Sequence, residues 1–524
     1  MNKHEYLYKL KNQFEERIKT HNIFKLSFED AARVTLEKVG VLYELIIFTK
    51  NEKMIQTLLK NYIDTNSINI DFVSFLQESL KWMFRFYSRF CSESSSINSS
   101  EIKAEDIYHL MGEMYSYEKF YFFWDIFNGN KTTYIKNKNQ ILFDFYNEEV
   151  YKTHVMYENY HRKNLNYHKA KSVTIKKDKS NFQDAMDYIH RQDFNIDFEI
   201  YFDNFNFKEF KIFSVFLNKL TLTNLNKALK KGQNIIIPGE SGLIIHSKQE
   251  WIEIISNECN IDSRKSEKII DFFTYDKDNF KSDISLSFFI PLKNNDLILS
   301  ESIFQLSLPQ ANALRLLKTK HKKNYDRAQN NFENLQIKEI QNTLSKNYLI
   351  AQKFDKTLNN RPGMDLLVYD YKNSHLQIIE LKYKIPIEST NDIKNLDSSL
   401  LNKAYTQLDK SKEIVSKNLD TILSEYFGED FINIKPQKID YFILTNYSIG
   451  TGIDFQLNLK LPTPILLIDH YLFLMNQDEG MKLVSTVLND KSKGLKFKIN
   501  KRYATYKLCN EKFKIPEFYS NVPY

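Results

Sequence analysis

The fold of the last third of the chain is decided by residues 361–384, which read Arg-Pro-Gly-Met-Asp-Leu-Leu-Val-Tyr-Asp-Tyr-Lys-Asn-Ser-His-Leu-Gln-Ile-Ile-Glu-Leu-Lys-Tyr-Lys. Two apolar runs, 364–369 and 376–383, are separated by the polar residues 370–375. A polar break of this kind turns one strand back on the next. The stretch therefore predicts a β-hairpin.

The hairpin is expected to bring three charged side chains together at one end. Glu380 and Lys382 are two residues apart, so a strand directs both side chains to one face and Leu381 to the other. Asp365 opens the first strand, and pairing across the hairpin brings its carboxylate to the same end. We therefore expect two carboxylates and an ammonium to converge.

This combination of side chains has a specific chemical use. Carboxylate oxygens such as those of Asp365 and Glu380 are hard ligands that hold Mg²⁺ while leaving water on the metal. An ammonium beside such a water, here that of Lys382, can orient or deprotonate it for attack on phosphorus. We expect a site for Mg²⁺, with Mn²⁺ as a substitute, ligated by Asp365 and Glu380.

Pro362-Gly363-Met364-Asp365, followed by Glu380-Leu381-Lys382, resembles the signature of the PD-(D/E)xK nuclease superfamily. Two residues stand between the proline and the aspartate, a variation common in that superfamily. The resemblance covers about residues 325–470 and implies a metal-dependent nuclease with a restriction-endonuclease-like core, a mixed central sheet flanked by helices. It also implies hydrolysis of phosphodiester bonds, with DNA as the expected substrate and restriction or anti-phage defence as the expected setting.

The flanking segments predict elements in the order of the superfamily's core. They are a helix over 325–344, the hairpin, a helix over 400–423, and strands at 439–446 and 464–468. Glu333 resembles the acidic residue that the superfamily places on the helix before the hairpin, and Glu339 is the alternative. Gln407 resembles the glutamine that one branch places beside the phosphate. The candidate catalytic residues are therefore Asp365, Glu380, Lys382, Glu333 and Gln407.

Composition limits the broad class of protein. A chain of 524 residues suggests two or three domains, and 42% hydrophobic residues are typical of a folded chain. The net charge of +7 is mild for this length, so charge alone does not establish a nucleic-acid partner. Cys91, Cys259 and Cys509 lie far apart, which argues against a disulfide scaffold and a cysteine zinc site. Residues 1–20 lack the apolar core of a signal peptide and no apolar run reaches 18 residues, so we expect a cytoplasmic protein without a membrane span.

The chain as a whole is expected to be multidomain, with three parts. These are a mostly helical N-terminal region at 1–180, a middle region at 181–310, and the nuclease-like α/β domain at 311–524. The N-terminal region is a candidate for self-association or for binding a protein partner. Its aromatic run 120–124 predicts helical core rather than a base-stacking surface.

The middle region resembles a winged helix. Helices are predicted at 249–259 and at 263–273 with Ser263 as the N-cap, followed by a hairpin of strands 284–292 and 297–304. In that reading Arg264, Lys265 and Lys268 lie on the recognition helix. A helical pair beside a hairpin also occurs without nucleic-acid binding, and this alternative stays open.

Residues 162–179 are strongly basic and mark a predicted boundary, either a phosphate-contacting strip or a solvated linker. Arg162 and His168 within it resemble the Arg-His motif of HEPN ribonucleases, which implies a metal-independent ribonuclease as one alternative function. A non-catalytic nucleic-acid-binding or interaction protein with a nuclease-like fold is another. The sequence leaves open DNA or RNA, and endonuclease or exonuclease.

Overall fold

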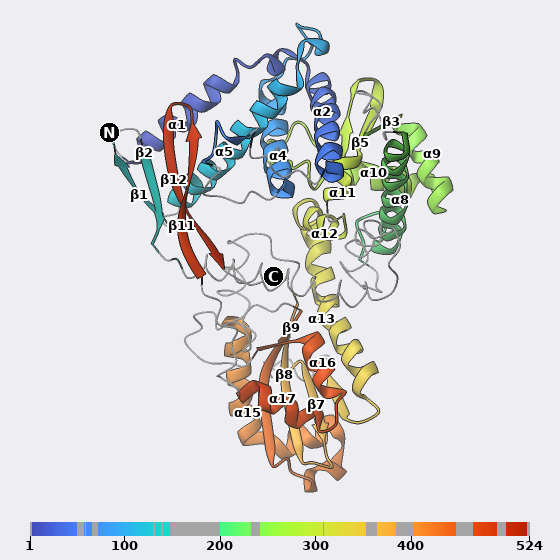
Figure 1. Cartoon of the computed structure of the whole chain (residues 1–524). Helices are drawn as coiled ribbons and strands as arrows, with labels where there is room; N and C mark the ends of the chain where they lie inside the picture. Colours follow the sequence, from blue (N-terminus) through green and yellow to red (C-terminus); the bar gives the residue numbers. More distant parts are fainter. Residues whose placement is uncertain are drawn as a thin grey trace. The chain divides into compact units, whose positions relative to one another are not determined.

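The computed structural model describes residues 3–49, 57, 59–64, 72–128, 132–137, 140–146, 148, 200–231, 242–307, 309–352, 364–383, 402–446, 465–489 and 499–520. The chain forms two compact units (Figure 1). Unit 1 comprises residues 1–147, 178–324 and 501–517, and unit 2 comprises residues 148–177, 325–500 and 518–524. The three predicted parts thus differ from the observed units, because the N-terminal and middle regions share unit 1 and a C-terminal hairpin joins them.

Unit 1 begins with a helical assembly, as the sequence predicts for the N-terminal region. Its long helices are α1 (Lys3–Ile18), α2 (Phe28–Thr49), α4 (Phe72–Phe90) and α5 (Ala104–Asn128). Phe120 and Phe123 of α5 are buried, and the other three residues of the aromatic run are half-buried. The prediction that this run belongs to the helical core is therefore confirmed.

A sheet that the sequence did not predict completes this part of unit 1. Strands β1 (Thr132–Asn137) and β2 (Gln140–Phe145) pair with β12 (Glu511–Ser520) and β11 (Ile499–Leu508) in the order β1-β2-β12-β11. The region expected to be mostly helical, 1–180, thus also contains the strands β1 and β2. Ile141, Phe143 and Phe145 alternate with more exposed residues, which is the period of a strand and not of a helix.

The remainder of unit 1 contains the two predicted helices of the middle region. Its elements are α8 (Phe207–Lys231), β3 (Leu243–Ser247), α9 (Lys248–Cys259), α10 (Ser263–Phe273), β4 (Phe289–Pro291), β5 (Asp296–Ser300), α11 (Glu301–Leu306) and α12 (Pro309–Lys320). The strands form an antiparallel sheet in the order β3-β5-β4. Two details correct the prediction. The N-cap of α10 is Asp262, which accepts a hydrogen bond from the backbone N–H of Lys265 at 3.0 Å, and β5 ends at Ser300 because that residue caps α11.

Unit 2 is built on a five-stranded mixed sheet. Helix α13 (Lys322–Leu344) leads into β6 (Leu349–Gln352), β7 (Leu366–Asp370), β8 (His375–Lys382), α15 (Asn402–Phe427), β9 (Lys438–Thr445), β10 (Ile465–Leu467), α16 (Ile468–Met475) and α17 (Gly480–Asn489). The strand order is β10-β9-β8-β7-β6, with β8, β9 and β10 parallel and the other pairs antiparallel. The predicted hairpin is confirmed as β7 and β8.

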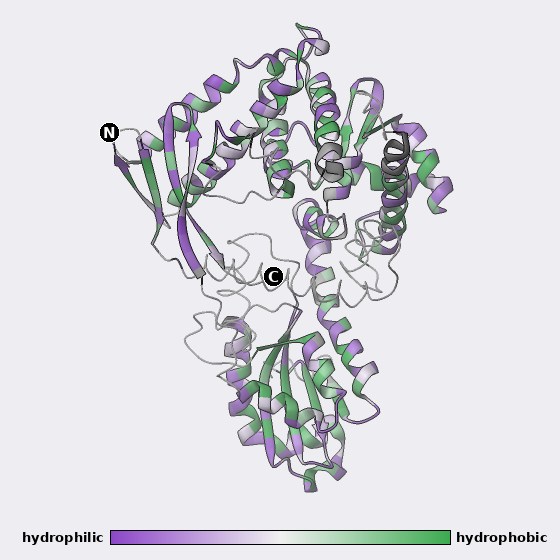
Figure 2. Cartoon of the chain, in the orientation of Figure 1, coloured by the Kyte–Doolittle hydropathy of each residue, from purple (hydrophilic) through white to green (hydrophobic). Residues whose placement is uncertain are grey.

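Helices cover both faces of this sheet, because apolar side chains alternate between its two sides. One face packs against α13, α16 and α17 and includes Leu366, Val368, Ile379, Leu381, Phe442 and Leu444. The other face packs against α15 and includes Leu367, Tyr369, Leu376 and Ile378. Hydrophobic residues run along the central strands (Figure 2). Sheets buried on both faces have near-continuous apolar strands of this kind.

No helix within the described ranges combines the length and the apolar character needed to cross a lipid bilayer.

Candidate active site

The register of the β7–β8 hairpin places Asp365 opposite Glu380. Leu366 pairs with Ile379 in this antiparallel register. Asp365, which precedes Leu366, therefore lies opposite Glu380, which follows Ile379. The Asp365 carboxylate also accepts a hydrogen bond from the backbone N–H of Leu381, at 2.9 Å. This bond anchors the carboxylate at the end of β8, where the sequence predicted it.

Glu380 and Lys382 share a face of the sheet, as predicted. Leu381 packs on the α13 side, so its two neighbours direct their side chains to the α15 side. The Lys382 ammonium donates hydrogen bonds to Oε1 of Glu380 and to the carbonyl oxygen of Leu381, the latter at 2.9 Å. It also lies 4.0 Å from Oδ2 of Asp365. One ammonium is therefore surrounded by three oxygen atoms.

The site is almost closed to solvent. Glu380 is 0% exposed and Lys382 is 8% exposed. Burial, followed by the neighbouring charge of Asp365, raises the pKa of Glu380 to about 8. Burial alone would lower the pKa of Lys382, but the charges of Glu380 and Asp365 outweigh it and raise that pKa. Large and opposed effects of this kind are concentrated at functional sites.

One oxygen of this cluster has no hydrogen-bond partner. Oε2 of Glu380 is buried, and no donor reaches it among the residues that the structure describes. An unpaired buried carboxyl oxygen is costly, because it loses its hydration without replacement. The oxygen is therefore suited to receive a further cationic or donating group.

Helix α13 brings Glu333 toward the ammonium. The ring of Phe332 stacks on Tyr383, with centroids 4.4 Å apart and planes 14° apart, which holds the helix against the end of β8. The charge of Glu333 contributes to the raised pKa of Lys382. The alternative, Glu339, is exposed. Of the two candidate residues on α13, Glu333 is thus the one whose charge acts on Lys382.

Gln407 lies on α15, the helix that covers the sheet face of Glu380 and Lys382. Its Oε1 atom is buried and has no hydrogen-bond partner within the described part of the chain. Helix α15 packs against β8, but no hydrogen bond joins Gln407 to the charged cluster among these residues. The structure therefore places Gln407 on the predicted helix without linking it directly to the carboxylates.

Two further polar residues were missed from the sequence. Thr445 pairs in register with Lys382 across the parallel strands β8 and β9 and is 1% exposed. Gln336 lies one helical turn after Glu333, is 4% exposed, and has neither amide atom hydrogen-bonded in the described structure. The sequence did contain a signal for each residue. Thr445 is a polar residue at the end of a predicted strand, and Gln336 is a polar residue within the apolar face of a predicted helix.

The donors present are compatible with a hard divalent cation. Within the described ranges, no three side chains of the His, Cys, Asp and Glu types form a metal-binding group. Mg²⁺ is commonly held by one or two carboxylates and keeps several waters. Asp365, Glu380 and the carbonyl oxygen of Leu381 meet that need, and the unpaired Oε2 of Glu380 adds an acceptor.

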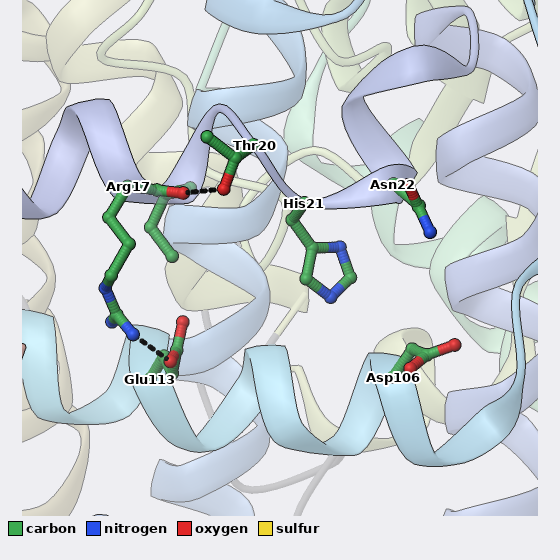
Figure 3. A pocket seen from close by; sticks show the side chains of 7 residues that line it. Arg17, Thr20, His21, Asn22, Asp106 and Glu113 are labelled. Atoms are coloured by element: carbon green, nitrogen blue, oxygen red, sulfur yellow. Dashed lines mark hydrogen bonds and ion pairs between the residues drawn. The ribbon is translucent and has the colours of Figure 1, made fainter.

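A second polar site lies in unit 1, between the end of α1 and α5 (Figure 3). This pocket of about 330 Å³ is lined by Arg17, Ile18, Thr20, His21, Asn22, Asp106 and Glu113. Arg17 pairs with Glu113 at 2.8 Å, and burial lowers the pKa of His21. The one permanent cation of the lining, Arg17, is already paired with Glu113, so the pocket does not indicate the charge of a ligand.

The remaining predicted site residues cannot be placed. Arg162, His168 and the basic segment 162–179 lie outside the described residues.

Comparison with known proteins adds no relative: no family model matches this sequence, and neither the curated proteins nor the solved structures contain a significant match.

Proposed function

We propose that this protein is a metal-dependent nuclease of the PD-(D/E)xK type. The observation that carries the proposal is the convergence of Asp365, Glu380 and Lys382 at the end of β8. The order of elements supports it, since a helix, three antiparallel strands, a helix and two parallel strands are expected of a restriction-endonuclease-like core. The location also supports it, because ligands of α/β sheets bind at the carboxyl ends of parallel strands.

Each residue has a chemical task in this proposal. Asp365, Glu380 and the Leu381 carbonyl would hold Mg²⁺ or Mn²⁺. When bound, such an ion polarises a phosphoryl oxygen and lowers the pKa of a coordinated water. Lys382 places a compact positive charge beside the attacking water and the phosphate. Thr445, which pairs with Lys382, and Gln407 of α15 are candidate donors to phosphate oxygens.

The winged-helix resemblance supports nucleic acid, with DNA first, as the substrate. The order α8, β3, α9, α10, β4, β5 and the sheet order β3-β5-β4 are those expected of a winged helix. Arg264 is exposed and Lys268 is half-buried on α10, whereas Lys265 is paired with Glu209 at 2.5 Å. Arg264 and Lys268 are therefore the better candidates for phosphate contacts.

One assay tests the proposed activity. The purified chain is incubated with labelled double-stranded DNA, single-stranded DNA and RNA in Mg²⁺, Mn²⁺ or EDTA. We expect cleavage with either metal and none in EDTA, and we expect Glu380→Ala to be inactive because a metal ligand is lost. Cleavage that persists in EDTA would contradict the metal mechanism.

A further inference from the structure

The ammonium of Lys382 occupies the position of a cation in the candidate metal site. It contacts Oε1 of Glu380 and the carbonyl oxygen of Leu381, and Oδ2 of Asp365 lies 4.0 Å away. These are the three groups that a divalent ion would need. The ammonium therefore supplies positive charge to these acceptors, as a bound ion would.

An ion and the ammonium cannot share this position. Mg²⁺ binds its oxygen ligands at about 2.0–2.1 Å, whereas the ammonium lies 2.9 Å from the Leu381 oxygen. An ion that took this position, bound to the Leu381 oxygen and to Oε1 of Glu380, would thus lie in direct contact with Nζ. Two positive charges in contact repel strongly where solvent is excluded, and Lys382 is 8% exposed.

We propose that Lys382 is the resident cation of this site and that divalent metal binds only when its ammonium leaves Glu380 and Leu381. The inference rests on the proposed metal-dependent function and extends it, because the metal ion must displace the Lys382 ammonium in order to bind. Glu333 is the other carboxylate whose charge acts on the ammonium. Lys382 then has a different role in each state of the protein. Without metal its ammonium occupies the site, and with metal bound it faces the phosphate of the substrate.

The first test uses the unmodified protein. Lysine amines are methylated with formaldehyde and borohydride in EDTA and in rising Mn²⁺, and labelling is quantified for each lysine by mass spectrometry. We expect Lys382 to be protected in EDTA and to become reactive as Mn²⁺ binds, because it loses both hydrogen-bond acceptors. Lys372, exposed in the turn between β7 and β8, is the internal control and should react equally throughout.

The second test measures affinity. Mn²⁺ binding is followed by calorimetry at pH 8.5, which limits competition from protons, for the wild type, Lys382→Met and Lys372→Met. Both variants lose one positive charge from the same hairpin, but only the first removes the competing cation. We expect Lys382→Met to bind Mn²⁺ about tenfold or more tightly than wild type, since removing a buried competing charge is a large effect. Lys372→Met should match the wild type.

The outcomes separate this inference from the proposed function. If neither the wild type nor Lys382→Met binds Mn²⁺, the metal site itself is absent and both proposals fail. If Mn²⁺ binds the wild type while Lys382 labelling stays unchanged, the metal site stands and the displacement is wrong. The labelling test remains decisive even if Lys382→Met does not fold.

Discussion

At the scale of single residues, Asp365 has two separable tasks. Its carboxylate receives the backbone N–H of Leu381 at 2.9 Å, which is a structural bond, and it faces the ammonium of Lys382 at 4.0 Å, which is an electrostatic one. An amide oxygen can accept the first bond but carries no charge for the second. Asparagine at this position therefore separates folding from metal binding.

We expect Asp365→Asn to fold like the wild type and to lose cleavage, because it keeps the acceptor for Leu381 but removes a charged metal ligand. Asp365→Ala should lose cleavage as well and also lower stability by about 1 kcal/mol, the typical net contribution of one hydrogen bond. The measurements are cleavage in Mg²⁺ and the midpoint of urea unfolding. Full activity of Asp365→Asn would remove this residue from the ligand set.

Lys382 is expected to act on the reaction more than on substrate binding. Lys382→Ala should lower cleavage by about two to four orders of magnitude, the usual scale for a group that assists proton transfer. Nucleic-acid affinity should change little, since phosphate contacts are spread over many cationic residues. Lys382→Arg should restore little activity, because guanidinium is not a compact point charge.

Two neighbouring lysines in the sequence, Lys384, which lies outside the described residues, and Lys372, serve as controls for Lys382. Lys384→Ala is expected to be mild, since residue 384 is one strand step further from the carboxylates in the sequence pattern, and Lys372→Ala should match the wild type. Cleavage rate and binding are measured for all three alanine variants. An essential Lys384 together with a dispensable Lys382 would show that the site is assigned to the wrong lysine.

At the scale of elements, a second buried polar cluster joins β8, β9 and α17. His375 bonds to Asp440 at 2.8 Å, and the hydroxyl of Ser485 donates to the same carboxylate. Burial alone would raise the pKa of Asp440, but these hydrogen bonds outweigh it and lower that pKa. His375 begins β8 and Lys382 ends it, so this cluster lies at the opposite end of the strand.

The lowered pKa of Asp440 predicts a pH dependence of stability. A carboxyl whose pKa is lower in the folded state stabilises the fold above its unfolded pKa of about 3.9, and this contribution is lost as pH falls through the folded pKa. Asp440→Asn should therefore cost about 1–3 kcal/mol at pH 7, the range for a buried hydrogen-bonded group. Near pH 2 the difference should shrink. Urea unfolding at both pH values checks this, and a difference that is constant with pH would contradict it.

At the scale of the whole molecule, the C-terminal hairpin belongs to unit 1 although it follows unit 2 in sequence. Phe513 of β12 is fully buried, and its ring contacts those of Phe120 and Phe143. The core of the unit is thus completed by Phe513, which follows its contact Phe120 on α5 by 393 positions (513 − 120). Contacts of such long sequence separation form late, because loop closure is entropically costly.

We expect Phe513→Ala to destabilise unit 1 by about 3–5 kcal/mol, the range for emptying a buried phenylalanine site. Unit 2 should keep its stability because Phe513 is not part of it. Hydrogen exchange resolved along the chain distinguishes the two units. Tyr146→Ala is the matched control in the same unit, since Tyr146 is 68% exposed. Faster exchange in β7 and β8 would contradict the division into units.

The alternative ribonuclease activity is also tested at this scale. Arg162→Ala and His168→Ala should leave cleavage within a few-fold of the wild type, because neither residue belongs to the proposed site, whose residues lie between positions 333 and 445. The assay uses RNA and DNA in parallel. A large loss on RNA alone would favour the metal-independent ribonuclease.

Local sequence patterns determined the β7–β8 hairpin, α13, α15 and the convergence of Asp365, Glu380 and Lys382. Each depends on a period of 2 or 3.6 residues and a turn, and such information is contained within about 25 residues. The C-terminal strands β9 and β10 were predictable for the same reason. Their position beside β8 is a parallel pairing, which no local pattern specifies.

The pairing of distant strands and the environment of the Lys382 ammonium were decided only by the tertiary structure. The sheet β1-β2-β12-β11 joins strands from the two ends of the chain, and its register depends on contacts between Ile141 and Phe513 that no window of sequence contains. The same holds for Thr445, which becomes a neighbour of Lys382 only through strand pairing. The position of the Lys382 ammonium on Glu380 and Leu381 depends on burial and on competing charges. Burial and charge balance arise from packing in three dimensions, so they could not be predicted from spacing alone.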